Sequence, residues 1–381
     1  MKQILENLRT GQVDVVEVPT PSIEPGSILV RNEYSVISAG TEKMLINFGN
    51  SSLIGKALQQ PDKVKQVLDK AKTDGIAATL SAVNNKLDNP ISLGYSCSGR
   101  VIEVGNKVNS YFKVGDLVAG SGHHADIVCI PQNLCAKVPE GVSSEEASFI
   151  GVAGISMQGV RLAKPTIGEC FVVTGLGLLG LFCVQLLKAN GCRVLGIDFN
   201  EDRLALAKQF GAEVVNLSIG QDLLSISQEF SRGHGVDGVI VCAASKSSEM
   251  VNQAADICRM RGRVIQVGVT GLELDREKFF RKEIKFQVSN STGPGKGDQV
   301  YEKLGFDYPV GFVRWTGQRN FEAVLDMMAD GRLDAKALIS HRFTLEEADA
   351  AYSLVCGSES SLGIVLEYDS DSDEEHELKK T

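Results

Sequence analysis

A glycine-rich turn between an apolar strand and a helix is the feature that most constrains how this 381-residue chain folds. The run from Val172 to Gly180 reads Val-Val-Thr-Gly-Leu-Gly-Leu-Leu-Gly, a G-x-G-x-x-G pattern. In such a turn the first glycine permits the bend, the second lets the backbone approach a pyrophosphate, and the third lets the helix pack closely on the strand. A second apolar strand follows the helix and ends at Asp198, where an acid binds a ribose hydroxyl. The pattern therefore predicts a nicotinamide dinucleotide site.

We expect the dinucleotide to contact the turn and the ends of the neighbouring strands. The predicted contacts are Thr174, Gly175, Gly177, Leu178, Leu179, Gly180, Asp198, Arg203, Cys242, Ala243, Val267, Gly268 and Val269. A 2′-phosphate would meet like charge at Asp198, so we expect the cofactor to be NAD and not NADP. Arg203 is the counterargument, because its guanidinium could turn towards a 2′-phosphate. We expect it to lie along the adenosine ribose instead.

Two patterns of strand and helix divide the chain. Short strands punctuated by Gly and Pro follow Thr20 and are typical of a β-rich, barrel-like domain, whereas alternating strands and helices are typical of a doubly wound parallel sheet. Helical spacing over 63–71 predicts a helical insertion within 50–87 that covers part of the barrel or the cleft. We therefore expect an α/β chain with a catalytic domain at 1–152, a dinucleotide-binding Rossmann domain at 153–291, a return to the catalytic domain at 292–368 and an acidic disordered tail at 369–381.

Charge and composition exclude several classes of function. The net charge is −9, and no basic patch with interleaved aromatic residues predicts nucleic-acid binding. No apolar run reaches the length of a membrane span, and the N-terminus lacks the apolar region of a secretory signal. The nine cysteines are scattered, which suits a reducing compartment. We expect a cytoplasmic protein with a small-molecule substrate.

Several short motifs resemble the medium-chain dehydrogenases/reductases, the superfamily of zinc alcohol dehydrogenases and quinone reductases. The motifs occur in the family's order and are Gly40-Thr41-Glu42, Leu93-Gly94-Tyr95, Val114-Gly115-Asp116, the 175–180 turn and Leu338-Ile339-Ser340-His341-Arg342-Phe343. The resemblance implies that the β-rich domain is GroES-like. Further stretches, such as Asp307-Tyr308-Pro309-Val310-Gly311-Phe312-Val313-Arg314-Trp315, resemble the N-terminal half of bacterial bi-domain oxidoreductases of polysaccharide gene clusters. In those proteins a second oxidoreductase domain follows.

The resemblance also shows where this chain departs from the zinc enzymes. The positions that hold the catalytic zinc there are occupied here by Ala39, Tyr95 and Val152. A catalytic zinc needs three protein ligands with nitrogen, sulfur or oxygen donors, and alanine and valine supply none. The cysteines of the structural zinc lobe are missing as well. We therefore expect no metal, and we interpret the adjacent His123 and His124 as ordinary loop or cleft residues.

Without zinc, a protein group has to handle the proton that accompanies hydride transfer. The candidates at positions that line the cleft in the superfamily are Tyr95, Thr41, Glu42 and His124, with Ser96 beside the substrate. Tyr95 is the most interesting candidate, because a phenol can donate a proton to a developing alkoxide. The alternative is that Tyr95 fills the volume that the metal has vacated. Thr41 matches the hydroxyl-relay position, and Glu42 has a structural salt bridge as its alternative role.

Arg314 and Trp315 are a second candidate substrate contact, because Trp315 is the single Trp of the chain. The pair suits stacking on a sugar ring and binding of a phosphate or carboxylate. The alternative is a Trp that packs between subdomains beside a surface Arg.

Together these features predict a zinc-independent, NAD(H)-dependent oxidoreductase. The resemblance implies a sugar or nucleotide-sugar intermediate of surface polysaccharide synthesis as its substrate. The alternative is a non-catalytic NAD(H)-binding module that docks a partner oxidoreductase. We expect residues 286–288 to form the edge strand of the parallel sheet, and a homodimer to form through that strand.

Overall fold

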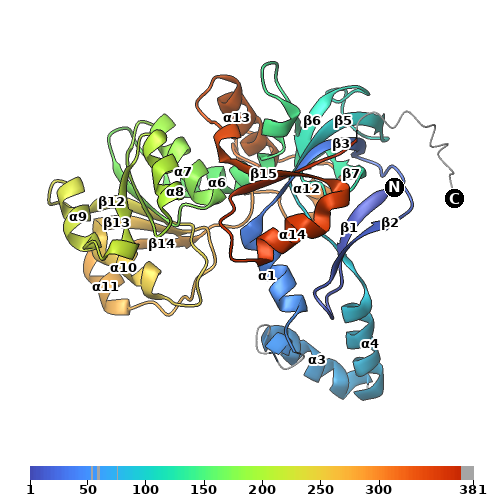
Figure 1. The fold of residues 1–381 in the computed structure, drawn as a ribbon, viewed down its shortest axis with the longest axis horizontal. Helices are drawn as coiled ribbons and strands as arrows, with labels where there is room; N and C mark the ends of the chain where they lie inside the picture. Colours follow the sequence, from blue (N-terminus) through green and yellow to red (C-terminus); the bar gives the residue numbers. More distant parts are fainter. Residues whose placement is uncertain (53–54, 58–60, 75, 370–381) are drawn as a thin grey trace.

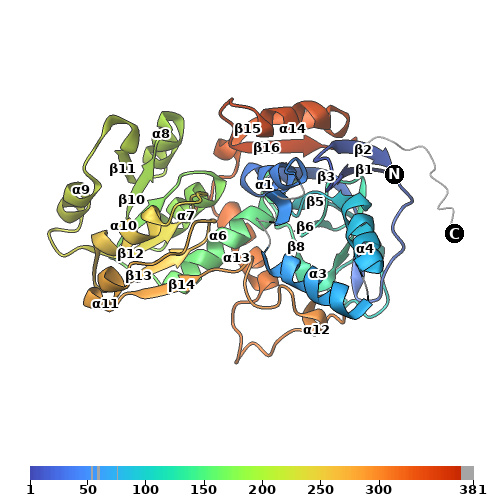
Figure 2. The same cartoon turned by 90° about the horizontal axis from the view of Figure 1, so that it is seen from below.

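The computed structural model describes residues 1–52, 55–57, 61–74 and 76–369. A parallel sheet and a set of antiparallel sheets lie side by side, and helix α6 (Ile150–Ala163) runs at their junction (Figures 1 and 2). Within the described ranges, no helix combines the length and the apolar character that crossing a membrane requires.

The parallel sheet has six strands in the order β11–β10–β9–β12–β13–β14. Their bounds are β9 (Cys170–Thr174), β10 (Arg193–Asp198), β11 (Glu213–Asn216), β12 (Val236–Val241), β13 (Cys258–Gln266) and β14 (Lys285–Val288). All neighbouring pairs are parallel, which confirms the predicted α/β, doubly wound sheet. The strand order reverses between β9 and β12, and ligands of such sheets bind at the carboxyl ends of the strands at this point.

Helices cover both faces of this sheet because the strands are apolar on both sides. Along β9, Phe171 and Val173 point to one face, where they pack with α6, α7 (Leu178–Ala189) and α8 (Glu201–Gln209). Val172 points to the other face, towards α9 (Leu223–Phe230), α10 (Glu249–Ile257) and α11 (Arg276–Lys282). The alternation follows from the two-residue repeat of a strand. The site is thus built on a rigid, buried scaffold.

The β-rich part contains two further sheets. The larger has the order β15–β16–β3–β5–β6–β8, with β7 paired to β3, and the smaller has the order β2–β1–β4. The bounds are β1 (Lys2–Glu6), β2 (Val13–Glu17), β3 (Ser27–Ile37), β4 (Ile91–Ser92), β5 (Cys97–Val104), β6 (Leu117–Gly120), β7 (Ile127–Pro131), β8 (Cys135–Lys137), β15 (Ile339–Thr344) and β16 (Gly363–Glu367). Strand β16 pairs with β3, so the segment that follows the parallel sheet returns to the β-rich part.

Some expected elements differ in extent or were missed. The strand expected at 114–118 begins only at Leu117, because Gly115 has a φ of 90° and forms a turn with Asp116. Helix α1 (Ala39–Gly49) was not expected, nor was the sheet made by β1, β2 and β4.

The predicted insertion forms a helical hairpin. It consists of α3 (Pro61–Asp74) and α4 (Ile76–Asp88). Figure 1 shows the hairpin extending away from the parallel sheet on the side of the β-rich part, and its covering of part of the barrel or the cleft stays a prediction. The acidic tail predicted at 369–381 lies outside the described residues after Asp369.

Four further α-helices lie within the described residues. They are α5 (Ser144–Ala147), α12 (Gln299–Glu302), α13 (Gly317–Ala329) and α14 (Ala348–Cys356). Strand β14 lies at the edge of the parallel sheet, which confirms the expected position of residues 286–288.

Candidate active site

The glycine-rich turn joins the carboxyl end of β9 to the start of α7. Gly175 has a φ of 88°, which a glycine adopts without strain. A Cβ at Gly180 would lie 1.9 Å from the carbonyl oxygen of Gly175, so only glycine lets the helix approach the strand this closely. A Cβ at Gly177 would meet nothing within 4 Å. This open space above the first turn of α7 is where a pyrophosphate would accept hydrogen bonds from the helix N-terminus.

Asp198 ties the end of β10 to the turn. Its Oδ2 accepts a hydrogen bond from the backbone N of Leu176 at 2.6 Å, and its Oδ1 accepts from the backbone N of Phe199 and Asn200 at 2.7 and 3.0 Å. The carboxylate is therefore fixed beside the turn, in a position that suits recognition of a ribose.

Arg203 projects from the first turn of α8 towards the C-terminal part of the chain. Its Nη2 donates to the carbonyl oxygen of Ser361 at 3.2 Å, and Asn200 Nδ2 donates to the Ser360 hydroxyl at 3.1 Å. The Nε of Arg203 is buried and has no hydrogen-bond partner in the described chain. An orphaned donor beside Asp198 fits a site that receives a polar ligand.

The other predicted cofactor residues follow the carboxyl ends of β9, β12 and β13. The backbone N of Cys242 donates to the carbonyl oxygen of Thr174 at 2.8 Å, which joins the ends of β12 and β9. A Cβ at Gly268 would lie 2.2 Å from the carbonyl oxygen of Ala243. The structure thus brings Thr174, Ala243 and Gly268 together at one edge of the sheet. Leu178 and Leu179 start α7, and Val267 and Val269 flank Gly268.

Two hydroxyls that sequence reasoning missed lie just beyond β14. The Oγ of Ser289 and the Oγ1 of Thr292 are buried without hydrogen-bond partners in the described chain. Because buried polar groups normally pair, they fit a site that a polar group such as a carboxamide completes. Their position after the last strand of the sheet was the available signal. The open glycine, the orphaned guanidinium nitrogen and these hydroxyls all fit a bound dinucleotide.

Tyr95 lies next to the start of α1. Its phenol hydrogen-bonds to the hydroxyls of Ser38 and Thr41. Burial raises the pKa of the Tyr95 phenol, and the nearby charge of Glu42 adds to this, whereas the two hydrogen bonds lower the pKa. The phenol is therefore protonated at neutral pH and holds a transferable proton. Thr41 is exposed, so this cluster of hydroxyls reaches solvent.

Glu42 and His124 are buried and bonded to each other, so they do not face a substrate as expected. The exposed fraction is 1% for Glu42 and 0% for His124, and His124 Nε2 lies 3.3 Å from Glu42 Oε2. Glu42 also accepts hydrogen bonds from the Ser38 backbone N at 2.9 Å and from the Tyr352 hydroxyl at 2.5 Å. The alternative structural role of Glu42 is the one that this geometry supports, because every contact of its carboxylate is internal.

The neighbouring His123 is the exposed member of the pair. Its Nδ1 lies 2.9 Å from the carbonyl oxygen of Gly94, directly before Tyr95. Burial in this cleft lowers the pKa of His123, and the positive charge of Lys296 acts in the same direction, while the bond to Gly94 raises it. The lowered pKa keeps His123 neutral at pH 7, and its Nε2 has no hydrogen-bond partner among the described residues. The sequence analysis interpreted it as an ordinary loop or cleft residue, because the side chains of adjacent residues diverge in an extended segment.

Ser96 is also internal and does not contact a substrate as expected. Its hydroxyl donates to the carbonyl oxygen of Ser148 at 2.5 Å and accepts from the backbone N of Gly151 at 2.8 Å. It therefore joins the start of α6 to the segment before β5 that contains Tyr95.

Glu6 forms a second buried acid near Glu42. It is 0% exposed, and neither carboxylate oxygen has a hydrogen-bond partner within the described ranges. Burial and the charge of Glu42 raise the pKa of Glu6 to about 7, although Lys56 acts in the opposite direction. Glu6 is therefore protonated below neutral pH in the folded protein.

We expect the variant Glu6→Gln to lose a pH dependence that the native protein shows. The folded-state pKa of about 7 exceeds the ordinary value of 4.5. The protonated carboxyl therefore stabilises the fold below pH 4.5, and this stability is lost as the pH rises to about 7. The loss is about 3 kcal/mol. Thermal unfolding between pH 4.5 and 8 measures it. The matched control is Glu17→Gln, an exposed acid on the same sheet; equal pH profiles of the native protein and Glu6→Gln would contradict the prediction.

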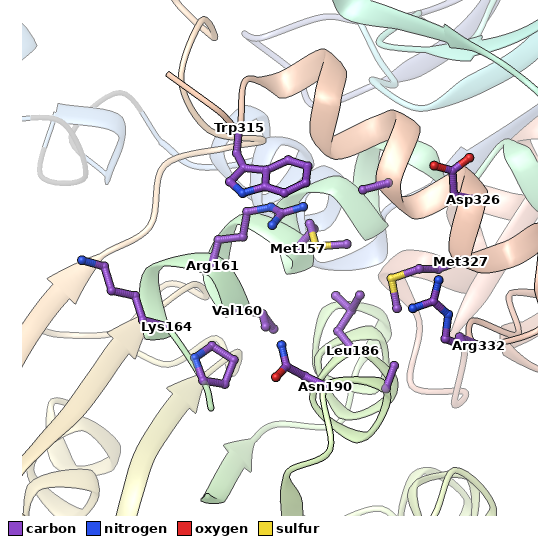
Figure 3. Close-up of a pocket in the computed structure, with 13 residues that line it drawn as sticks. Met157, Val160, Arg161, Lys164, Leu186, Asn190, Trp315, Asp326, Met327 and Arg332 are labelled. Atoms are coloured by element: carbon purple, nitrogen blue, oxygen red, sulfur yellow. The ribbon is translucent and has the colours of Figure 1, made fainter. Parts of the chain in front are cut away.

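Arg314 and Trp315 lie away from the cofactor cleft, so they do not contact a substrate there as expected. Trp315 lines a cavity together with Lys164, which precedes β9, and with Ala189 and Asn190 at the end of α7 (Figure 3). These residues lie at the amino ends of the strands, whereas the glycine-rich turn lies at the carboxyl end of β9. Trp315 instead packs at the junction of α6 and α13, as the alternative interpretation had it.

The residues at the zinc positions do not fit a metal ion. Ala39 and Val152 have no donor atoms, and Val152 is 0% exposed in the core. The described residues contain no group of three or more His, Cys, Asp or Glu side chains arranged to hold a metal. No step of the chemistry is derived through zinc.

Known proteins resemble this chain over most of its length. The zinc-binding dehydrogenase family matches residues 179–305. The sorbitol dehydrogenase of Halalkalibacterium halodurans is 24% identical over 307 residues, covering 71% of this chain and 82% of that protein. The D-arabitol-phosphate dehydrogenase of Enterococcus avium is 24% identical over 358 residues, covering 83% and 94%.

A solved structure agrees in fold. The galactitol-1-phosphate dehydrogenase of Escherichia coli superimposes with a TM-score of 0.73 at 20% identity, covering 96% of this chain and 99% of that one. Residues 179–305 match the zinc-binding dehydrogenase family, and the chain is similar in sequence and in fold to NAD(P)-dependent oxidoreductases of the medium-chain type.

Proposed function

We propose that this protein transfers a hydride between NAD(H) and the carbinol or carbonyl carbon of a polyol or sugar, without zinc. The observation that carries the proposal is the Tyr95 phenol at a metal-ligand position, hydrogen-bonded to Ser38 and Thr41. A protonated phenol is a general acid for a developing alkoxide. It supplies locally what a metal would otherwise provide.

The proton path follows from this cluster. NAD(H), when bound, accepts or donates the hydride. In the direction of reduction, the Tyr95 hydroxyl gives its proton to the carbonyl oxygen as the carbon receives the hydride. The phenolate then regains a proton through the exposed Thr41 hydroxyl, which lies 3.5 Å from Ser38 Oγ. In the direction of oxidation the same groups act in reverse.

The substrate class rests on the relatives and on the predicted family association. Sorbitol, D-arabitol phosphate and galactitol 1-phosphate are all linear polyols or their phosphates, and they occur in the names of the similar proteins. They support a polyol or a sugar as the substrate. The narrower prediction of a sugar or nucleotide-sugar intermediate of surface polysaccharide synthesis remains part of this proposal.

A turnover assay on the purified full chain tests the proposed function. Nicotinamide absorbance is followed with polyols, polyol phosphates, sugars and nucleotide sugars, and bound zinc is measured by elemental analysis. We expect turnover with at least one substrate at a zinc content far below one per chain. Turnover that disappears with a chelator and returns with zinc would contradict the metal-free chemistry. Binding of NADH without turnover of any of these substrates would favour the non-catalytic module.

We expect NADH to bind at least tenfold more tightly than NADPH. The fixed Asp198 carboxylate repels a 2′-phosphate, and Arg203 is already bonded to the Ser361 carbonyl. Repulsion of about 1.4 kcal/mol or more between the Asp198 carboxylate and the 2′-phosphate lowers the affinity for NADPH by a factor of about 10 or more. Fluorescence titration with each cofactor measures the ratio, and Asp198→Asn should narrow it. Comparable dissociation constants for NADH and NADPH in the native protein would contradict the prediction.

We propose that β14 pairs with the same strand of a second chain, giving a homodimer. The strand is an unpaired edge, and Val288 on it is 53% exposed. Light scattering at micromolar concentration should give twice the chain mass of 41.0 kDa. The N–H of Ser289 donates to Gln266 on β13, so the alternate residue Val288 directs its N–H to the open edge. The variant Val288→Pro removes this donor and should shift the protein to monomers. A native protein that is monomeric at this concentration contradicts the proposal.

A further inference from the structure

A cavity of about 460 Å³ lies at the amino ends of the parallel strands. Figure 3 shows Arg161 on one side of it and Asp326, Met327 and Arg332 on the other, with Lys164 at the rim and its ammonium directed outwards. It lies at the end of α7 opposite to the glycine-rich turn, and twelve helical residues separate the two by about 18 Å. It is therefore separate from the cofactor cleft. Its volume is in the range of small-molecule sites.

Among the described residues, the cations on one side of the cavity form no ion pair, although the charge of Arg314 acts on Glu322. The guanidinium carbon of Arg161 lies 3.2 Å from the centre of the Trp315 ring, and that of Arg314 lies 3.8 Å from it. Arg161 Nε donates to the amide oxygen of Asn320 at 2.6 Å. Over the described ranges, Arg161, Arg314 and Lys164 take part in no ion pair. Burial and the charge of Arg314 lower the pKa of Arg161 to about 10, and Arg161 is still charged at pH 7.

The acidic residues near the cavity interact with Arg332. Asp330 forms an ion pair with Arg332, and the charge of Asp326 also raises the pKa of Arg332. These two carboxylates therefore offset Arg332 and leave Arg161 and Lys164 unmatched. In a chain whose net charge is −9, such a local excess of positive charge is unusual. A partly buried guanidinium without a counter-ion gains most from an anion that shares its low-dielectric surroundings.

We propose that this cavity is a second binding site, for a small organic phosphate whose anionic group binds the Arg161 guanidinium, with the exposed and flexible side chain of Lys164 turning in from the rim. The free Nη atoms of Arg161 suit the forked geometry of a phosphate. The side chains of Met157, Val160 and Leu186 line the cavity and offer apolar contact to the carbon skeleton. The site is independent of the proposed hydride transfer, which takes place at the other end of the strands.

Trp315 reports on this cavity directly because it is the single Trp of the chain. The full protein is first saturated with NAD⁺, so that added phosphates cannot occupy the dinucleotide site. Glycerol 3-phosphate, inorganic phosphate and sodium chloride are then titrated at constant ionic strength while Trp315 emission is recorded. We expect a saturable change with glycerol 3-phosphate, a weaker one with inorganic phosphate, and none with chloride.

Two variants locate the binding. Lys164→Gln and Arg161→Lys should each weaken the binding of glycerol 3-phosphate roughly tenfold or more, because each removes a charge-assisted or forked contact. Lys164 is exposed, so Lys164→Gln should keep the melting temperature and the NAD⁺ affinity. The matched control is Arg276→Gln, which removes an exposed arginine stacked on Phe280 elsewhere on the surface. It should change nothing.

The outcomes separate the possibilities. An emission change that follows ionic strength alone, or an affinity unchanged in Lys164→Gln, overturns the proposal and leaves the cations as a cap on the end of α6. Equal affinities for inorganic phosphate and glycerol 3-phosphate overturn the part played by the apolar wall.

Discussion

Tyr95→Phe is expected to lower turnover by ~10²–10⁴, the usual cost of losing a positioned proton donor. The substitution removes one oxygen and keeps the ring, so the volume at the former metal position stays filled. The affinity for NADH should stay within about twofold, because the cofactor is held by the turn after β9, by Asp198 and by the ends of β12 and β13. Steady-state kinetics and a separate NADH titration measure the two quantities.

The control for this variant is Tyr34→Phe, which removes a phenol hydroxyl on the same domain whose partner is Glu367 at 3.3 Å. It should leave turnover unchanged. If Tyr95→Phe also leaves turnover unchanged, Tyr95 only fills space, and His123, the exposed histidine beside Gly94, becomes the candidate acid or base.

Gly177→Ala should abolish most of the cofactor affinity without harming the fold. The new Cβ meets nothing within 4 Å in the protein itself, and Gly177 has no positive φ, so the melting temperature should stay the same. The same Cβ occupies the space through which a pyrophosphate approaches the backbone. We expect NADH to bind at least roughly 100-fold more weakly, a loss of about 2.7 kcal/mol.

Substitutions of two further glycines serve as comparisons for Gly177→Ala. Gly311→Ala also places a methyl group in open space, but far from the turn, and should alter neither property. Gly180→Ala drives a Cβ against the Gly175 carbonyl and should lower both the melting temperature and the cofactor affinity. Normal NADH binding by Gly177→Ala would mean that the dinucleotide does not cross this turn.

The parallel sheet was predictable because its signals are local. The glycine-rich turn, the apolar strand on each side of it and the acid after β10 all lie within residues 170–198, and the structure keeps them in that order. The antiparallel sheets were only partly predictable. Strand β1 pairs with the nearby β2 and with β4, which is distant in sequence, and the two-residue strand β4 carries no pattern of its own.

The candidate site was likewise predictable only in part. Residues that act through backbone geometry, such as Gly177 and Gly268, could be read from the chain. The orientation of side chains could not, because it depends on tertiary packing. His123 and His124 are adjacent, yet one is exposed and the other is enclosed with Ser35 and Glu42. Trp315 was placed near the substrate on resemblance, whereas stacking with Arg161 holds it at the far end of α6.

The hydrogen bonds that join Ser96 to the start of α6 bear on how such a protein evolves. Its hydroxyl binds the start of α6, and a Cβ at Gly151 would lie 2.8 Å from the Tyr95 carbonyl oxygen, so strand and helix are in close contact. Metal binding would need donors at Ala39, Tyr95 and Val152 at once, because a zinc site requires three. A single replacement at any of them confers no metal affinity, and replacing Tyr95 removes the phenol as well. Under the proposed chemistry, Tyr95 would have to be the last of the three positions to change, because an earlier change removes the phenol before three ligands are in place.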